Sequence, residues 1–199
     1  MTRLAMVLAV CAGAAQAEEL VIDQTGFTAI HVNEDVTVNI TYGDEYSVVA
    51  RTVDGDLSKL DVNRYSGWLV FNRDTRWFIF PNGRTDEFIV DITTPVLNEV
   101  KSFDGSRVFV TGLTADALRA EAATGGTLTL LDASVDDLAL VVNDGSIAAD
   151  GTCETVALTG TAGFVDASAL ACATGTAPPQ DVIQSMFGDS VRLEVKPAD

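Results

Sequence analysis

The chain has 199 residues, and its 29 acidic residues against 12 basic ones give a net charge of −17. Such an acidic surface repels phosphate backbones and anionic lipids, so we expect neither a nucleic-acid partner nor a polybasic membrane contact. Hydrophobic residues make up 47%. This fraction predicts a packed core rather than a disordered acidic chain, and the length fits one domain.

Residues 1–17 have the three parts of a secretory signal peptide. Arg3 gives a basic start, residues 4–14 form an apolar run too short for a membrane helix, and Ala-Gln-Ala precedes Glu18. We therefore expect cleavage before Glu18 and export to the periplasm or the cell surface. A lipoprotein signal at Cys11 is the alternative, and the bulky Val before this cysteine disfavours it.

The segment 18–96 is predicted to be an N-terminal β-layer. Polar and apolar residues alternate along it, and the apolar positions are rich in β-branched and aromatic side chains, a pattern typical of half-buried strands. A short helical turn is expected at 56–60. The predicted strands lie at 27–32, 36–41, 46–50, 68–71 and 88–92.

The segment 97–199 is repetitive. Glycine-centred turns recur at Gly105, Gly126, Gly145 and Gly163, in steps of 21, 19 and 18 residues, and a short apolar stretch follows each turn. A repeat of about 20 residues built from short strands indicates a parallel β-solenoid, in which stacked rungs supply the core. The predicted class is therefore all-β, with the N-terminal layer continuing into a short parallel β-helix or solenoid. An antiparallel sandwich with irregular turns is the alternative.

Two cysteines remain after the predicted cleavage. Cys153 follows Gly145 by eight residues, and Cys172 follows Gly163 by nine, so the cysteines hold nearly equivalent places in successive rungs. Stacked equivalent residues lie ~4.8 Å apart, within the range that a disulfide spans. We predict a Cys153–Cys172 disulfide that links two rungs. Two buried free thiols are the alternative.

The order of short motifs from about 27 to 195 resembles a family of bacterial envelope proteins, the "putative auto-transporter adhesin, head GIN domain". The resemblance implies an exported β-solenoid-like protein and supplies no catalytic residues. The residues that carry it are Phe27, Ile30 and Val32; Val36-Thr37-Val38; Trp68 to Phe71; Val90 to Leu97; Gly105-Ser106; Gly145-Ser146; Pro178-Pro179; and Ser190 to Leu193.

Catalytic and metal-binding patterns are weak. His31 is the single histidine, and it lies in an alternating strand where a surface or packed role is expected. We therefore expect no enzyme, no cofactor and no metal site. A calcium-stabilised spacer is an alternative, against a solvated acidic edge that keeps the protein soluble. The acidic residues concerned are Asp132, Asp136, Asp137, Asp150 and Glu154.

One basic and aromatic segment contrasts with the acidic background. Six Lys and Arg residues and six aromatic residues lie between 51 and 84. Trp and Arg favour recognition surfaces, so the segment could hold a glycan or an acidic partner. Core aromatics with charge-balancing arginines are the alternative. The candidate binding residues are Arg73, Arg76, Trp77, Phe78, Phe80 and Arg84.

These observations predict an exported, non-catalytic interaction module of the bacterial envelope. It would be adhesin-like, with an unknown envelope protein or glycan as its partner. The alternative is a carbohydrate- or ligand-binding protein that uses the aromatic and Arg patch at 73–84.

Overall fold

The computed structural model describes residues 18–52, 55–73, 87–176 and 191–192. These residues form one sheet of 12 strands and contain no α-helix, which confirms the all-β class. The strands are β1 (Glu18–Val21), β2 (Ala29–Val32), β3 (Thr37–Tyr42), β4 (Ser47–Thr52), β5 (Leu60–Tyr65), β6 (Trp68–Arg73), β7 (Phe88–Thr94), β8 (Glu99–Ser102), β9 (Arg107–Thr111), β10 (Thr114–Ala123), β11 (Thr127–Thr176) and β12 (Val191–Arg192).

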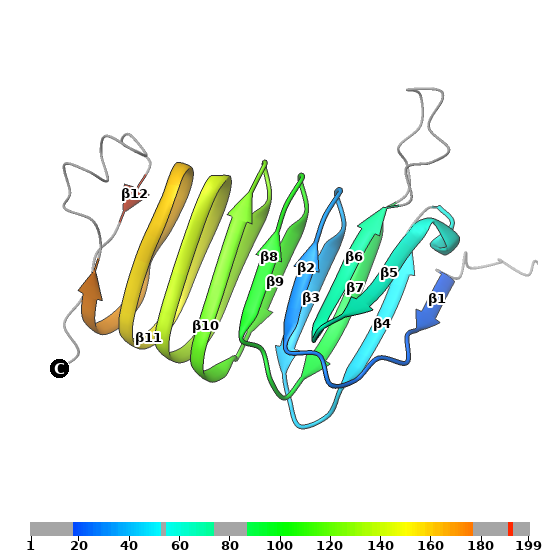
Figure 1. The fold of residues 1–199 in the computed structure, drawn as a ribbon, viewed down its shortest axis with the longest axis horizontal. Coiled ribbons are helices and arrows are strands. Elements are labelled where there is room, and N and C mark those ends of the chain that lie inside the picture. The colour runs from blue at the N-terminus through cyan, green and yellow to red at the C-terminus, as the bar shows by residue number, and fades with distance from the viewer. Residues whose placement is uncertain (1–17, 53–54, 74–86, 177–190, 193–199) are drawn as a thin grey trace, which may run out of the picture.

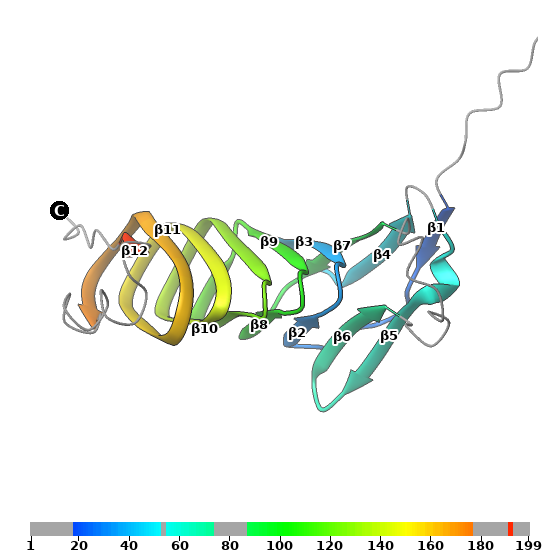
Figure 2. The same cartoon turned by 90° about the horizontal axis from the view of Figure 1, so that it is seen from above.

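The sheet curls so that two limbs face each other across the core (Figures 1 and 2). Its strand order is β1-β4-β7-β3-β9-β11-β10-β8-β2-β6-β5, and β12 pairs with β11. The limb with β5, β6, β2 and β8 continues into β10, and the limb with β1, β4, β7, β3 and β9 continues into β11. Beyond β9 the ribbon winds in successive turns that lie side by side along the long axis (Figure 2).

The first strands of the chain lie between later ones. β2 pairs in parallel with β6 on one side and β8 on the other. β3 likewise pairs in parallel with β7 and β9. Antiparallel pairing is confined to the end of the sheet that carries β1, β4 and β5. The N-terminal segment is therefore joined to the repetitive segment by parallel ladders on both limbs.

Equivalent residues of successive passes stack with a regular offset. Glu99 pairs with Arg119, and Arg119 pairs with Ala139, so each step is 20 residues. Within β11 the side-chain contacts join residues 18 apart, as where the Thr155 hydroxyl donates to the Asp137 carboxylate at 2.7 Å. The offset therefore shortens toward the C-terminal end, as the steps between the glycine turns predict.

The core runs without interruption from the first strands to the last passes of the chain. Alternate residues of each strand point inward, because successive side chains of a strand face opposite sides. Large aromatic side chains fill the end that carries β6 and β7, as with the fully buried Phe27, Phe71 and Phe88. Smaller residues such as Val165 and Ala167 fill the later passes.

The predicted helical turn at 56–60 is confirmed as a 3-10 helix at Leu57–Lys59. Asp56 caps it, because its carboxylate accepts a hydrogen bond from the Ser58 backbone N–H at 2.9 Å. The predicted signal peptide at 1–17 and the motif at Pro178-Pro179 lie outside the described residues.

Candidate binding face

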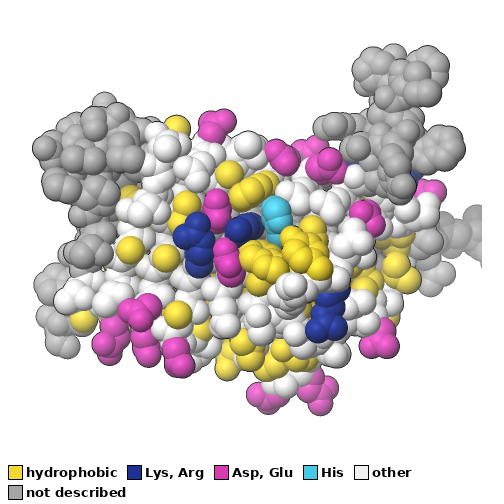
Figure 3. Space-filling view, viewed as in Figure 1, with side chains coloured by type: hydrophobic (Ala, Val, Ile, Leu, Met, Phe, Trp, Pro, Cys, Tyr) yellow, Lys and Arg dark blue, Asp and Glu magenta, His cyan; other side chains and the backbone are white. Residues whose placement is uncertain are grey.

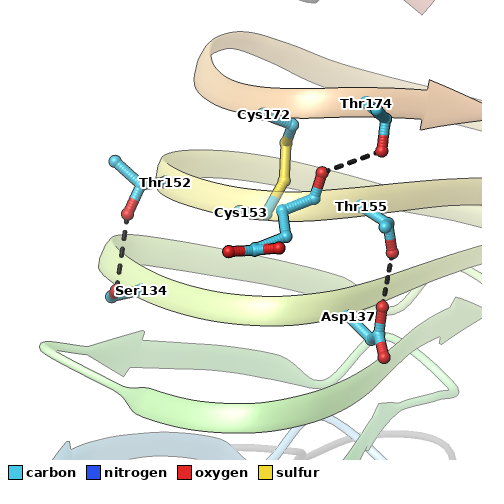
Figure 4. Close-up of a disulfide and its surroundings, with 8 residues drawn as sticks. Ser134, Asp137, Thr152, Cys153, Thr155, Cys172 and Thr174 are labelled. Carbon is cyan, nitrogen blue, oxygen red and sulfur yellow. Dashed lines mark hydrogen bonds between the residues drawn. A yellow bond between two sulfur atoms is a disulfide. The ribbon is translucent and has the colours of Figure 1, made fainter. Parts of the chain in front are cut away.

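The predicted disulfide is present between two neighbouring passes of β11 (Figure 4). The Cα atoms of Cys153 and Cys172 are 4.4 Å apart, and both side chains are buried. Side-chain hydrogen bonds connect the neighbouring passes, including one from the Thr174 hydroxyl to the Glu154 carbonyl at 3.1 Å. This cysteine pair is a structural cross-link, and it confirms the pairing that the repeat spacing predicts.

Of the predicted binding patch, the structure describes Arg73 alone. Its side chain is 5% exposed, and its guanidinium carbon lies 5.0 Å from the centre of the Phe88 ring. The Arg73 backbone N–H donates to the Glu34 carboxylate at 3.0 Å. Arg73 is therefore packed inside the fold at the end of β6. Arg76, Trp77, Phe78, Phe80 and Arg84 lie outside the described residues.

A different group of side chains gathers on the outer side of one limb. Parallel register places one row across the strands at Trp68, Ala29, Glu99 and Arg119. A second row runs through Val70, His31, Lys101 and Glu121. Figure 3 shows hydrophobic side chains beside the histidine on this side of the molecule, with basic and acidic side chains next to them. The two rows bring together residues that are up to 90 positions apart in the sequence.

Four aromatic side chains form one part of this surface, which we call the aromatic row: Tyr65, Trp68, His31 and Phe103. Ser66 and Gly67, both with positive φ, form the tight turn that sets Tyr65 opposite Trp68. The His31 ring centre lies 4.8 Å from that of Phe103 and 6.2 Å from that of Trp68, both edge to face. Tyr65 is 57% exposed, so aromatic surface reaches solvent here.

The other part is an ion-pair lattice of Glu99, Lys101, Arg119 and Glu121. The Lys101 ammonium lies 3.3 Å from Glu99 and 3.6 Å from Glu121. The Arg119 guanidinium lies 3.3 Å from Glu99 and 3.2 Å from Glu121. Lys101 also lies over the Trp68 ring, 4.9 Å from its centre, and so links the lattice to the aromatic row. Two acids and two bases give the lattice no net charge.

His31 lies where the two parts meet. Burial and the neighbouring Lys101 lower the pKa of its imidazole below the usual 6.5, against the opposing effects of Glu121, a hydrogen bond with Asn33, and Asp104. Its buried Nε2 has no hydrogen-bond partner within the described ranges. The neutral ring therefore packs among aromatics, a more enclosed setting than the strand surface that its sequence position indicates.

The sequence alone does not single out Trp68, Lys101, Glu99 and Arg119 as one site. Trp68 follows the turn dipeptide Ser66-Gly67 and alternates with inward residues, a pattern that indicates an outward aromatic. Nothing in the local sequence predicts that this tryptophan lies near residues 99–121. That proximity comes from the placement of β2 between β6 and β8.

Metal-binding groups do not converge in the described part of the chain, where no three His, Cys, Asp or Glu side chains could hold an ion together. Likewise, none of the helices among these residues has the length and apolarity needed to cross a membrane. The chemistry available on this limb is stacking, ion pairing and hydrogen bonding.

Residues 26–177 match the model of the family described as "Putative auto-transporter adhesin, head GIN domain", and the chain belongs to this family. No curated protein sequence matches it. The resemblance carried by the motif order is thereby confirmed over most of the chain.

Solved structures share the fold at low sequence identity. A putative adhesin from Bacteroides fragilis NCTC 9343 is similar with a TM-score of 0.71 at 17% identity, over 81% of this chain and 75% of that one. A putative lipid binding protein from Parabacteroides distasonis ATCC 8503 gives a TM-score of 0.59 at 12% identity, over 81% and 77%. A putative adhesin from Parabacteroides merdae ATCC 43184 gives 0.55 at 18% identity, over 80% and 75%.

Proposed function

We propose that this protein is an exported, non-catalytic, adhesin-like module of the bacterial envelope that holds its ligand on the aromatic row and the ion-pair lattice. The family it belongs to and two of the similar structures carry the adhesin description. The observation that carries the proposal is the position of Trp68, Lys101 and Arg119 on one outer limb. A rigid sheet suits such a surface, because it holds the side chains at fixed spacing without an ordering cost on binding.

The architecture that we propose is a parallel β-solenoid with rungs of about 20 residues. The 20-residue offsets between Glu99, Arg119 and Ala139 support it, as do the parallel ladders. In this proposal the chain is a single domain from 18 to 199, with the layer at 18–96 forming its N-terminal part. A solenoid of this kind is a spacer and a scaffold at once, since each rung adds length and outer surface.

The proposed location is the periplasm or the cell surface, after removal of residues 1–17. The basic, apolar and Ala-Gln-Ala parts of this segment support export. The disulfide agrees with an oxidising compartment. The net charge of −17 supports partners other than nucleic acid.

A second candidate uses the patch at 73–84. Its composition of Arg76, Trp77, Phe78, Phe80 and Arg84 supports a carbohydrate- or ligand-binding surface. Arg73 is the member whose burial argues against direct contact with a ligand.

Beads that carry the mature chain test the proposed function. They are mixed with fluorescently labelled cells of the native bacterium and of host epithelium, and retained cells are counted. We expect retention of at least one cell type, with no chemical change in soluble envelope extract after incubation. Retention equal to that of beads carrying denatured protein would contradict the proposal.

A paired variant separates the two candidate surfaces. Trp68→Ala removes the centre of the aromatic row, and Trp77→Ala removes the tryptophan of the second patch. The primary proposal expects loss with Trp68→Ala and unchanged retention with Trp77→Ala. The reverse result would favour the patch at 73–84.

A further inference from the structure

We propose that the ligand of this face is a neutral oligosaccharide chain, which lies across the strands with a sugar ring on the aromatic row and its hydroxyl groups on the ion-pair lattice. This inference rests on the proposed function and names the ligand class of the same site. It depends on three features of the face, namely its aromatic surface, its charge balance and its shape.

The aromatic surface begins at the edge of the limb. Tyr65 on β5 is exposed and lies opposite Trp68 on β6, and both side chains point outward. The π face of an aromatic ring is partially negative, and the C–H groups on one side of a pyranose ring are partially positive. The Lys101 ammonium over Trp68 shows that this ring already attracts a positive group. A sugar ring can therefore stack on Tyr65 and on the part of Trp68 that Lys101 leaves open.

The polar groups provide the complementary half of the contact. Glu99 offers acceptors, and Arg119 offers donors in a fixed fork, with 3.3 Å between the two groups. Neighbouring sugar hydroxyls both donate and accept, so such a pair of hydroxyls can bind both residues at once. Hydrogen bonds to charged groups are stronger than those between neutral groups. The side chain of Arg119 is 45% exposed, which leaves it accessible.

The charge balance selects a neutral ligand. The lattice has no net charge, while the whole chain carries −17. An anionic glycan would be repelled by the molecule as a whole and would meet Glu99 and Glu121 at the face. A cationic ligand would gain more from the excess of acidic side chains elsewhere on the chain. A polyol without charge is the ligand that loses nothing by binding here.

The shape of the face suits a chain more than a protein surface. Tyr65, Trp68, Ala29, Glu99 and Arg119 succeed each other across neighbouring strands. At about 4.8 Å for each strand, this row is roughly 20 Å long, and it is flanked by a single further row. A stable protein interface buries about 800 Å² on each partner, which exceeds this strip. The small Ala29 between the aromatic and ionic ends leaves room for the middle of a bound chain.

Tryptophan fluorescence tests the inference directly. The chain has two tryptophans, so a Trp77→Phe background makes Trp68 the only emitter. The mature protein is titrated with neutral hexasaccharides of β-1,4-linked glucose, N-acetylglucosamine, mannose and xylose, and with hexagalacturonate as the charged comparison. We expect a saturable emission shift with at least one neutral chain and none with hexagalacturonate. Absence of a shift with every neutral chain, or a stronger shift with hexagalacturonate, would overturn the inference.

Variants identify the contacts by calorimetric titration of the hexasaccharide that binds. We expect Arg119→Gln and Tyr65→Ala each to weaken binding about tenfold, the effect of losing a central contact. Trp68→Ala is expected to abolish measurable binding. Tyr42→Ala is the matched control, because Tyr42 is a 39% exposed aromatic on β3 of the other limb. Equal weakening by Tyr42→Ala, or none by Arg119→Gln, would contradict the assignment.

The bead assay separates this inference from the proposed function. Cells that are retained through Trp68 while free neutral hexasaccharides neither bind nor compete would leave the adhesin role standing and overturn the saccharide ligand. No retention of any cells, together with no oligosaccharide binding, would overturn both.

Discussion

Single residues on this protein have roles that follow from what surrounds them, and His31 is the clearest case. The same imidazole on an open strand would keep its ordinary pKa. Between Trp68 and Phe103 it loses water, and the cation of Lys101 lies nearby, so its neutral form is favoured in the folded state. A proton on His31 would be disfavoured by the fold around it.

This setting predicts a pH dependence of stability. Because the folded-state pKa of His31 lies below 6.5, the unfolded chain binds the proton more readily. The stabilising contribution of His31 is therefore complete above pH 6.5 and is lost as the pH falls from 6.5 toward the lowered folded pKa. Urea unfolding at pH 7.5 and at successively lower pH should show this decline. A His31→Gln variant should show a shallower slope over the same interval, and an identical slope would contradict the prediction.

Gly151 shows how closely neighbouring passes approach. It has φ +134, and a Cβ atom placed there would meet the Ala133 backbone of the previous pass. Gly112 has φ +68 but open space around the same atom. The first glycine is therefore needed for both conformation and contact distance, and the second for conformation alone.

We predict that Gly151→Ala lowers the free energy of unfolding by about 3 kcal/mol, the sum of backbone strain and overpacking. Gly112→Ala is the matched control, with an expected loss of about 1 kcal/mol from its left-handed backbone alone. Equilibrium urea unfolding measures both. Equal losses in the two variants would contradict the close approach at Gly151.

At the scale of elements, the last passes of β11 contain few large side chains. Val165, Ala167 and Leu170 fill the interior there, in place of the phenylalanines found near β6 and β7. Less apolar area is buried by each pass, so less hydrophobic stabilisation is available. The Cys153–Cys172 disulfide is located in this part of the molecule. It offsets the thinner core by restricting the unfolded chain.

The disulfide prediction follows from its loop length. The cysteines are 19 residues apart, and closing a loop of that size contributes about 3 kcal/mol in the chain-entropy model. Reduction of the wild type should lower the free energy of unfolding by about this amount, measured in urea with and without a thiol reductant. A Cys153→Ser, Cys172→Ser double variant should be as unstable as the reduced wild type and should not respond to reductant. A response in the double variant would show that the reductant acts elsewhere.

For the whole molecule, the insertion of β2 and β3 into the sheet decides how it unfolds. These strands pair with β6 and β7 on one side and with β8 and β9 on the other. Removing them would break the ladder on both limbs at once. The two halves of the chain should therefore unfold as one cooperative unit, unlike a layer that is merely attached to a repeat array.

An Ile40→Ala variant tests this coupling. Ile40 is 2% exposed on β3, and its truncation should cost about 2–4 kcal/mol, the range for large-to-small core changes. Trp68 fluorescence reports the first half, and amide exchange at Leu138–Val142 reports the second. Both should lose the same free energy. Loss of the fluorescence transition with unchanged exchange at 138–142 would show independent halves.

The sequence by itself determined the strands, the repeat length and the disulfide. Period-two alternation is a local property, and the glycine steps report the length of each pass, so the spacing alone places Cys153 and Cys172 in equivalent positions. The motif order likewise indicated the family. Each of these features is encoded within about 20 residues of chain or in their order.

Only the tertiary structure decided which strands are neighbours. Nothing in residues 29–42 states that they lie between strands that come 30 to 60 positions later, because parallel pairing depends on contacts remote in sequence. That arrangement places Trp68 beside Lys101 and His31 beside Phe103. The core could therefore be predicted from local alternation. The candidate binding face could not, because it consists of outward residues whose proximity is set by strand order alone.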